Sequence, residues 1–272
     1  FRSHLALGHV CGETLTCRFH GWRFSGEGDV VHVPYGKRSP ARVTSHPVEI
    51  FYGMVCAYLG ASGPLERAPY ALGRMEGIDD GRLTYRGAYD AHEVRMHLVE
   101  FAENSADVQH FRHLHDRFRI PWTQIPIPGV GLAHSATWHA DPDEPHVCWF
   151  DNQAVVTFRG KRVEGRGGHA RVRFDGPGTV IRFEIDLGGR GKVVLFQFHT
   201  PKAKLTQHVR FRWYAERHVP DGLARFVVGH WISQWEQDLE IWETKAYRPQ
   251  PGLVAEDGPV IAMRRWVQQF YV

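Results

Sequence analysis

Three short stretches of the sequence carry residues that could hold a metal ion. The first, "CRFHGW", places Cys17 and His20 at the spacing C-x-x-H. The second, "ENSADVQHFRHLH", places Asp107, His110 and His115 at the spacing D-x-x-H-x-x-x-x-H. Thiolate, imidazole and carboxylate groups are the ligands that proteins offer to transition metals, so each stretch predicts part of a metal site.

The spacing of the two histidines in the second stretch does not suit a regular helix. At 100° per residue, His110 and His115 diverge by about 140°. Both can face one ion only if the helix distorts or ends between them, through a π-bulge or a loosened last turn. His113, three residues after His110, is an alternative ligand on spacing alone.

The third stretch is a predicted helix, "DGLARFVVGHWISQWEQDLEIWETK", with an acid on its apolar face. Asp238 lies there among apolar side chains at helical spacing: Trp231, Trp235, Ile241 and Trp242. A carboxylate on an apolar face costs free energy unless it is paired or binds a metal. An ion pair with Lys245 is one explanation, and metal ligation is the other.

Together, the second and third stretches offer two histidines and one carboxylate. This set is the facial triad of non-haem Fe(II) oxygenases, which leaves coordination positions open for O₂.

The C-x-x-H-G-W motif fits zinc sites poorly. It fits a Rieske [2Fe–2S] centre, in which two cysteines bind one iron and two histidines the other. Such a centre needs a C-x-H pair upstream of Cys17, and we expect that pair to lie before Phe1. Within the sequence, His4, His9 and Cys11 have the wrong spacing to replace it.

Composition limits the classes of protein to which the chain can belong. Its 272 residues are 43% hydrophobic and 23% charged, as in a soluble globular protein. A net charge of +3 gives no case for nucleic acid or an anionic membrane as a partner. Four cysteines without repeating spacing are too few for a disulfide framework and indicate a reducing compartment.

The pattern of elements predicts an α+β protein with two domains. Residues 1–62 read as short strands, with "SGEGD" as a hairpin turn and "FYGMVCAYLG" as one strand. After a candidate domain boundary, residues 63–272 begin with the strand "RLTYRGAY" and a long helix over 92–115. Five strand-like runs between 152 and 214 then predict an antiparallel sheet, and a second long helix follows over roughly 221–247.

The chain resembles the Rieske non-haem iron oxygenases, in particular their terminal oxygenase components. The resemblance rests on "GHVCGETLTCRFHGWRFSGEG", "ENSADVQHFRHLH", "QDLEIWETKAYRPQP" and "DGPVIAMRRWVQQFY". Within this family it is similar to the steroid-directed branch of cholesterol 7-desaturases and 3-ketosteroid 9α-hydroxylases. The resemblance implies a small all-β Rieske [2Fe–2S] domain, then a helix-grip, START-like catalytic domain.

The family's roles carry over to matching positions. The resemblance implies that Cys17 and His20 bind the cluster, and it selects His115 over His113 as an iron ligand. The implied ligands of the mononuclear iron are His110, His115 and Asp238. Asp107 matches the aspartate that passes electrons from the cluster of a neighbouring subunit, and Asn104 matches a residue that supports the ligands.

The implied activity is oxidation of a sterol or steroid with O₂ and electrons from NAD(P)H, delivered by a ferredoxin or reductase. We favour cholesterol 7,8-dehydrogenation, with a steroid monooxygenase such as a 3-ketosteroid 9α-hydroxylase as the alternative and a non-enzymatic lipid-binding protein as the remote one. Electron transfer between subunits implies a homotrimer. The expected location is cytoplasmic if the protein is bacterial, or at a membrane through an upstream anchor.

Overall fold

The structure, a computed structural model, describes residues 3–37, 39–60, 68–246 and 248–271. Its contacts divide the chain into two compact units, Phe1–Ala71 and Leu72–Val272. The predicted boundary between residues 62 and 63 lies outside the described residues. Among those described, no helix is both long and apolar enough to cross a membrane.

The first unit is built from short antiparallel strands. Its four-stranded sheet has the order β1-β2-β3-β4, with β1 (His9–Cys11), β2 (Thr14–Thr16), β3 (Arg23–Phe24) and β4 (Val30–His32) following a 3₁₀ turn, η1 (Leu5–Leu7). The hairpin turn predicted at "SGEGD" is confirmed, because the Ser25 N–H donates to the Asp29 carbonyl at 2.9 Å.

The single strand predicted at "FYGMVCAYLG" is wrong. The stretch contributes to a hairpin of β5 (Val48–Phe51) and β6 (Met54–Ala57). Tyr52 and Gly53 turn the chain with φ of 47° and 79°, the left-handed pair that two-residue hairpin turns require.

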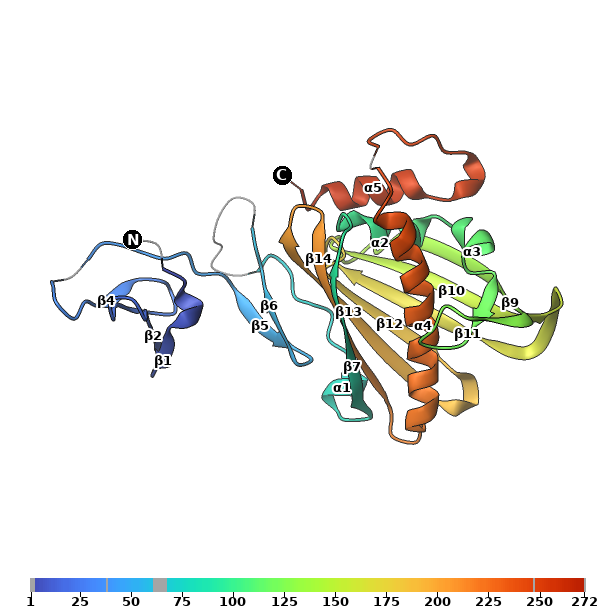
Figure 1. The fold of residues 1–272 in the computed structure, drawn as a ribbon, viewed down its shortest axis with the longest axis horizontal. Helices are drawn as coiled ribbons and strands as arrows, with labels where there is room; N and C mark the ends of the chain where they lie inside the picture. The colour runs from blue at the N-terminus through green and yellow to red at the C-terminus, as the bar shows by residue number, and fades with distance from the viewer. Residues whose placement is uncertain (1–2, 38, 61–67, 247, 272) are drawn as a thin grey trace. The chain divides into compact units, whose positions relative to one another are not determined.

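The second unit is dominated by an eight-stranded antiparallel sheet of order β7-β14-β13-β12-β11-β10-β9-β8 (Figure 1). Its strands are β7 (Leu83–Val94), β8 (Arg117–Arg119), β9 (Pro126–Ala140), β10 (Val147–Phe158), β11 (Lys161–Asp175), β12 (Val180–Asp186), β13 (Lys192–Ala203) and β14 (Thr206–Glu216). The strand predicted at "RLTYRGAY" and the five predicted between 152 and 214 are confirmed. The sequence reading missed β8 and β9.

The helices of this unit are more numerous and shorter than the two long helices predicted. They are α1 (Glu76–Asp79), α2 (Val99–Ala106), α3 (His110–His113), α4 (Asp221–Trp242) and α5 (Val260–Gln268), with 3₁₀ turns η2 (Gly188–Arg190) and η3 (Ala255–Asp257). The single helix expected over 92–115 is wrong. The strand β7 runs to Val94, and the helical path stops after Ala106 because Asp107 is extended at φ −85° and ψ 98°.

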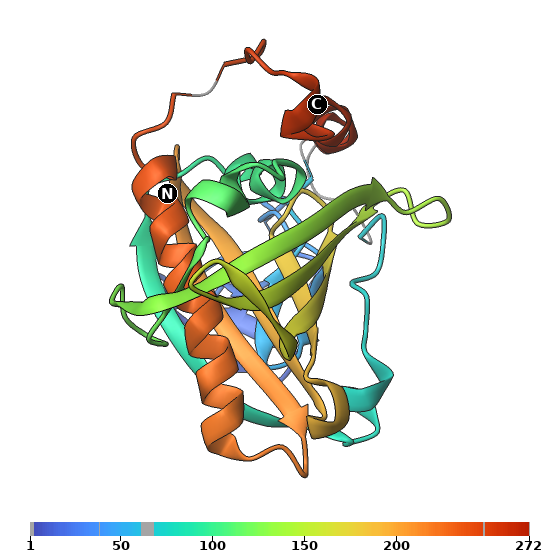
Figure 2. The same ribbon diagram turned by 90° about the vertical axis from the view of Figure 1, so that its right-hand side faces the viewer.

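The long helix α4 lies across one face of the curled sheet (Figures 1 and 2). Its buried face contributes Val228, Ile232 and Trp235 to a core shared with side chains from β12 and β13, among them Phe183 and Leu195. The predicted tryptophan face is confirmed at Trp235 and Trp242, which are buried. Ile241 was wrongly assigned to this face, since 51% of the residue is exposed.

An ion-pair network joins α2 to the segments after α4. Lys245 Nζ lies 2.8 Å from both Glu100 Oε2 and Glu103 Oε1, and Arg264 Nε of α5 lies 2.7 Å from Glu103 Oε2. Burial alone would raise the pKa of Glu103. The ion pairs with Arg264 and Lys245 lower it by more than burial raises it, so the pKa of Glu103 lies below its usual value. Lys245 is therefore engaged by these two glutamates, and its proposed pairing with Asp238 is wrong.

We expect Arg264→Met to reduce the free energy of unfolding by about 3–5 kcal/mol, because it leaves the buried carboxylate of Glu103 with one cation fewer. Urea unfolding followed by tryptophan fluorescence measures this, since all tryptophans but Trp22 lie in the second unit. The matched control is Arg265→Met at the exposed next position. Equal stabilities of the two variants would contradict the prediction.

The same network predicts a pH dependence. A carboxylate whose pKa is lowered by folding contributes stability above its unfolded pKa and loses it as the pH falls through the folded value. The difference in the free energy of unfolding between the native protein and Arg264→Met should therefore be largest at neutral pH. It should decrease as the pH falls through the folded pKa of Glu103.

Candidate metal centre and adjoining cavity

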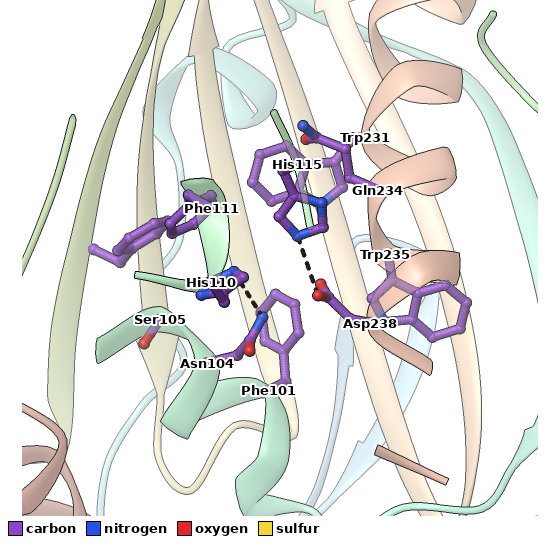
Figure 3. A pocket seen from close by; sticks show the side chains of 11 residues that line it. Phe101, Asn104, Ser105, His110, Phe111, His115, Trp231, Gln234, Trp235 and Asp238 are labelled. Carbon is purple, nitrogen blue, oxygen red and sulfur yellow. Dashed lines mark hydrogen bonds and ion pairs between the residues drawn. The ribbon is translucent and has the colours of Figure 1, made fainter. Parts of the chain in front are cut away.

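His110, His115 and Asp238 converge inside the second unit (Figure 3). His110 begins α3, His115 follows that helix, and Asp238 lies on α4. One ligand atom from each residue lies within 4.8 Å of the other two, and they form the one such group of three or more among the described residues. His115 is 2% exposed and Asp238 5%, whereas the alternative ligand His113 is exposed.

The contacts of His115 leave a lone pair facing an anion. Its Nδ1 lies 3.2 Å from Gln237 Oε1, an acceptor, so Nδ1 carries the proton and donates. In the neutral imidazole that binds a metal, the lone pair of Nε2 then faces Asp238 Oδ1 at 3.1 Å. Neighbouring ligands of one octahedral ion, each at about 2.1 Å, are about 3.0 Å apart, so the arrangement fits a divalent cation bound by both atoms.

His110 is oriented by residues of its own segment. The Asp107 carbonyl accepts a hydrogen bond from Nδ1, and Asn104 Nδ2 lies 3.1 Å from Nε2. Burial lowers the pKa of His110, which keeps the imidazole neutral and able to bind a metal. The rings of His110 and His115 are 5.2 Å apart between centroids and nearly perpendicular.

The donor set consists of two neutral imidazoles and one carboxylate. Soft thiolates are absent from the described residues around it, and the combination matches the 2-His-1-carboxylate triad that binds Fe(II). Asp107 lies at the edge of the group, where its Oδ1 accepts the backbone N–H groups of Gln109 and His110.

A cavity of about 550 Å³ adjoins the triad. It lies between strands β9–β12 and α4, and it shares Trp231 and Gln234 with the small pocket around His110, His115 and Asp238. Its apolar lining is formed by Phe118, Ile127, Val130, Leu132, Ala154, Val156, Ala170, Ile185, Leu187, Leu223, Phe226 and Val227. Volume and lining are those of a pocket for a small hydrophobic molecule.

Sequence reasoning missed three polar residues of this cavity: His134, Asn152 and His230. The first two lie on β9 and β10, and the third on α4 one residue before Trp231. Alternation along β10 could have placed Asn152 on an inward face, but β9 itself was not predicted.

In the first unit, Cys17 and His20 lie in one tight turn. The Cys17 N–H donates to the Trp22 carbonyl at 2.8 Å, and the Gly21 N–H donates to the Cys17 carbonyl at 2.9 Å. The backbone N–H of Phe19 is the main cause that lowers the pKa of the Cys17 thiol, which favours the thiolate that binds metal. Among the described residues, His4, His9 and Cys11 complete no group of three ligands with this pair.

Comparison with known families matches both units. The model of the Rieske [2Fe-2S] domain matches residues 2–49, and that of the 3-ketosteroid 9alpha-hydroxylase C-terminal domain matches residues 64–271.

The curated relatives are named cholesterol 7-desaturase or 3-ketosteroid-9-alpha-monooxygenase, oxygenase component. A cholesterol 7-desaturase of Caenorhabditis elegans is 32% identical, over 94% of this chain and 62% of that protein. A probable 3-ketosteroid-9-alpha-monooxygenase oxygenase component of Rhodococcus rhodochrous is 28% identical, over 99% of this chain and 67% of that protein. The chain spans 58–62% of the length of the first three relatives, all cholesterol 7-desaturases.

Solved structures share the fold. NdmA of Pseudomonas putida CBB5 with caffeine aligns with a TM-score of 0.67 at 18% identity, over 97% of this chain and 74% of that one. Dicamba monooxygenase bound to dicamba aligns with a TM-score of 0.65 at 16% identity, over 98% of this chain and 82% of that one.

We expect Asp238→Asn to weaken Fe(II) binding, because it removes the only negative charge of the donor set. His110→Ala and His115→Ala should do the same, each by roughly 100-fold or more, since each deletes a ligand outright. Anaerobic titration with Fe(II) or Co(II), followed by absorbance or calorimetry, measures the affinity. His113→Ala is the matched control, and a loss of affinity there equal to that of His115→Ala would refute the assignment.

Proposed function

Since the chain belongs to the Rieske non-haem iron oxygenases with a 3-ketosteroid 9α-hydroxylase C-terminal domain, we propose that it oxidises a sterol or steroid at an iron held by His110, His115 and Asp238. The observation that carries the proposal is the buried triad at one end of a large apolar cavity. When bound there, the iron supplies activation of O₂.

The protein's own residues prepare this site. Gln237 fixes the tautomer of His115, and Asn104 with the Asp107 carbonyl orients His110. Phe101 and Trp235 cover the triad with apolar surface, which keeps bulk water from the reacting positions. The cavity wall holds the substrate by burying its rings.

Cys17 and His20 supply two of the four ligands of a Rieske [2Fe–2S] cluster. A bound cluster would receive electrons from NAD(P)H through a ferredoxin or reductase, and Asp107 would link the cluster of a neighbouring subunit to His110 in a homotrimer. The hydrogen bonds of Asp107 to His110, through both its carbonyl and its Oδ1, support this role.

The favoured reaction is 7,8-dehydrogenation of cholesterol. It is supported by the relatives named cholesterol 7-desaturase, which are 26–33% identical to this chain over at least 94% of it. Hydroxylation of a 3-ketosteroid is the second candidate, supported by the two Rhodococcus relatives and the family model.

The first experiment measures iron and acid-labile sulfide per chain in the anaerobically prepared holoenzyme. Three irons and two sulfides are expected, since one Rieske cluster and one mononuclear iron require them. Incubation with cholesterol, reductase, NADH and O₂ should then give a product two mass units lighter. A product heavier by one oxygen atom would favour the monooxygenase. The absence of turnover with any steroid would rule out the proposed substrate class.

We expect Asp107→Asn to lower turnover by roughly 10- to 100-fold while leaving iron content unchanged. The amide keeps the oxygen that accepts the N–H groups of Gln109 and His110, so only the charge is lost. The measurement is product formed per iron in single and multiple turnovers. Asp116→Asn, at an exposed position after His115, is the control, and unaltered turnover of Asp107→Asn would exclude the electron-transfer role.

A further inference from the structure

Two imidazoles in the wall of the cavity have buried nitrogen atoms without a partner. They are Nε2 of His134 on β9 and Nδ1 of His230 on α4. Buried polar atoms in folded proteins nearly always make a hydrogen bond. Since both residues line the large cavity, a molecule bound in that cavity can supply the missing partner.

His134 is held so that its free nitrogen is an acceptor. Its Nδ1 lies 3.2 Å from Asn152 Oδ1, the oxygen of a buried amide, so Nδ1 donates and Nε2 keeps a lone pair. The ring stacks on Phe111, the neighbour of His110, with centroids 5.0 Å apart.

His230 presents a second neutral imidazole to the same region. Its ring lies parallel to Phe118, with 4.4 Å between centroids and 10° between planes. Burial, and then the nearby imidazoles of His134 and His115, lower the pKa of His230 to about 4. A neutral imidazole has one N–H donor and one acceptor nitrogen, so the pair can serve both sides of a hydroxyl group.

We infer that His134 and His230 bind a hydroxyl group of the steroid, whose O–H donates to His134 Nε2 and whose oxygen accepts the N–H of His230. The inference rests on the proposed function and narrows it to hydroxysteroids, since a ketone cannot donate to His134. Sites built to hydrogen-bond a hydroxyl reject analogues that lack it. The same contact fixes which part of the rings faces His110, His115 and Asp238.

The test compares the binding of three steroids that share one skeleton: cholesterol, the ketone cholestenone and the hydrocarbon cholestene, each delivered from cyclodextrin. Quenching of the fluorescence of Trp231, which lines the cavity, reports binding without turnover. We expect cholesterol to bind about five- to tenfold more tightly than cholestenone, the factor that one ordinary hydrogen bond contributes, and more tightly again than cholestene, which can make neither bond.

His134→Phe and His230→Phe keep the ring stacking and remove the nitrogen atoms. His134→Phe should abolish the preference for cholesterol over cholestenone, whereas His230→Phe should keep that preference and weaken the binding of both relative to cholestene. Cholestene affinity should stay unchanged in both variants, which also shows that they are folded. His134→Gln retains an acceptor and should keep part of the preference. His139→Phe, at an exposed position of the same strand, is the matched control.

Equal binding of cholesterol and cholestenone by the native protein would overturn the inference while leaving the proposed function intact. An equal loss of affinity for all three steroids in His134→Phe and His230→Phe would also overturn it, because the residues would then only shape the cavity. No binding of any of the three would overturn both the inference and the proposed function.

Discussion

The interruption of the helical path, first at Asp107 and again after His113, is the constraint on which the metal centre depends. On a continuous helix, His110 and His115 would point about 140° apart, and one of them would face solvent as His113 does. The extended conformation of Asp107 ends α2, and its carboxylate accepts the first free N–H groups of the next turn. The one-turn helix α3 then ends before His115, so the chain itself can turn both imidazoles toward Asp238. The aspartate that breaks the helix is thus also bonded to the ligand His110, which couples backbone geometry to the site.

The burial of Asp238 is the second requirement. A carboxylate beside Trp235 loses its hydration, and only a cation or a network of donors offsets that cost. The nearby cation Lys245 is held by Glu100 and Glu103 instead, and in the described part of the chain the ion-pair partner of Asp238 is His115. Because Gln237 holds the proton of His115 on Nδ1, the nitrogen facing Asp238 is an acceptor. A divalent cation bound by both atoms would remove the repulsion between the two lone pairs. The ion-pair network around Glu103 holds Lys245 and so keeps its ammonium group from pairing with Asp238.

Much of this arrangement follows from local patterns in the sequence. The alternation of apolar and polar residues in β10 to β14 predicted the sheet. The tryptophan spacing of α4 predicted that Asp238 lies on the buried face of that helix, because periodicity records which side of an element is buried. The strand β9 escaped prediction since "PIPGVG" carries prolines and glycines that usually break strands. The helix expected over 92–115 failed because the helical spacing of its residues continues past Asp107, although the carboxylate of Asp107 caps the next turn locally. Ile241 shares a helical stripe with Asp238 yet is exposed, because in the last turn of α4 the core covers Trp242 and not Ile241.

The cavity shows why a few polar atoms matter in a mostly apolar wall. Apolar contact rewards burial but has no direction, so a rigid ring system could enter in several orientations of similar free energy. A hydrogen bond has direction, and in a dry cavity an unmade one is costly. Placing His134 and His230 close to His115 therefore penalises every orientation that leaves their nitrogen atoms unpaired. The residues Trp231 and Gln234, shared by the cavity and the triad pocket, connect that choice of orientation to the place where a C–H bond would meet the oxidant. No single segment of sequence contains this site, because it forms only where β9, β10 and α4 meet.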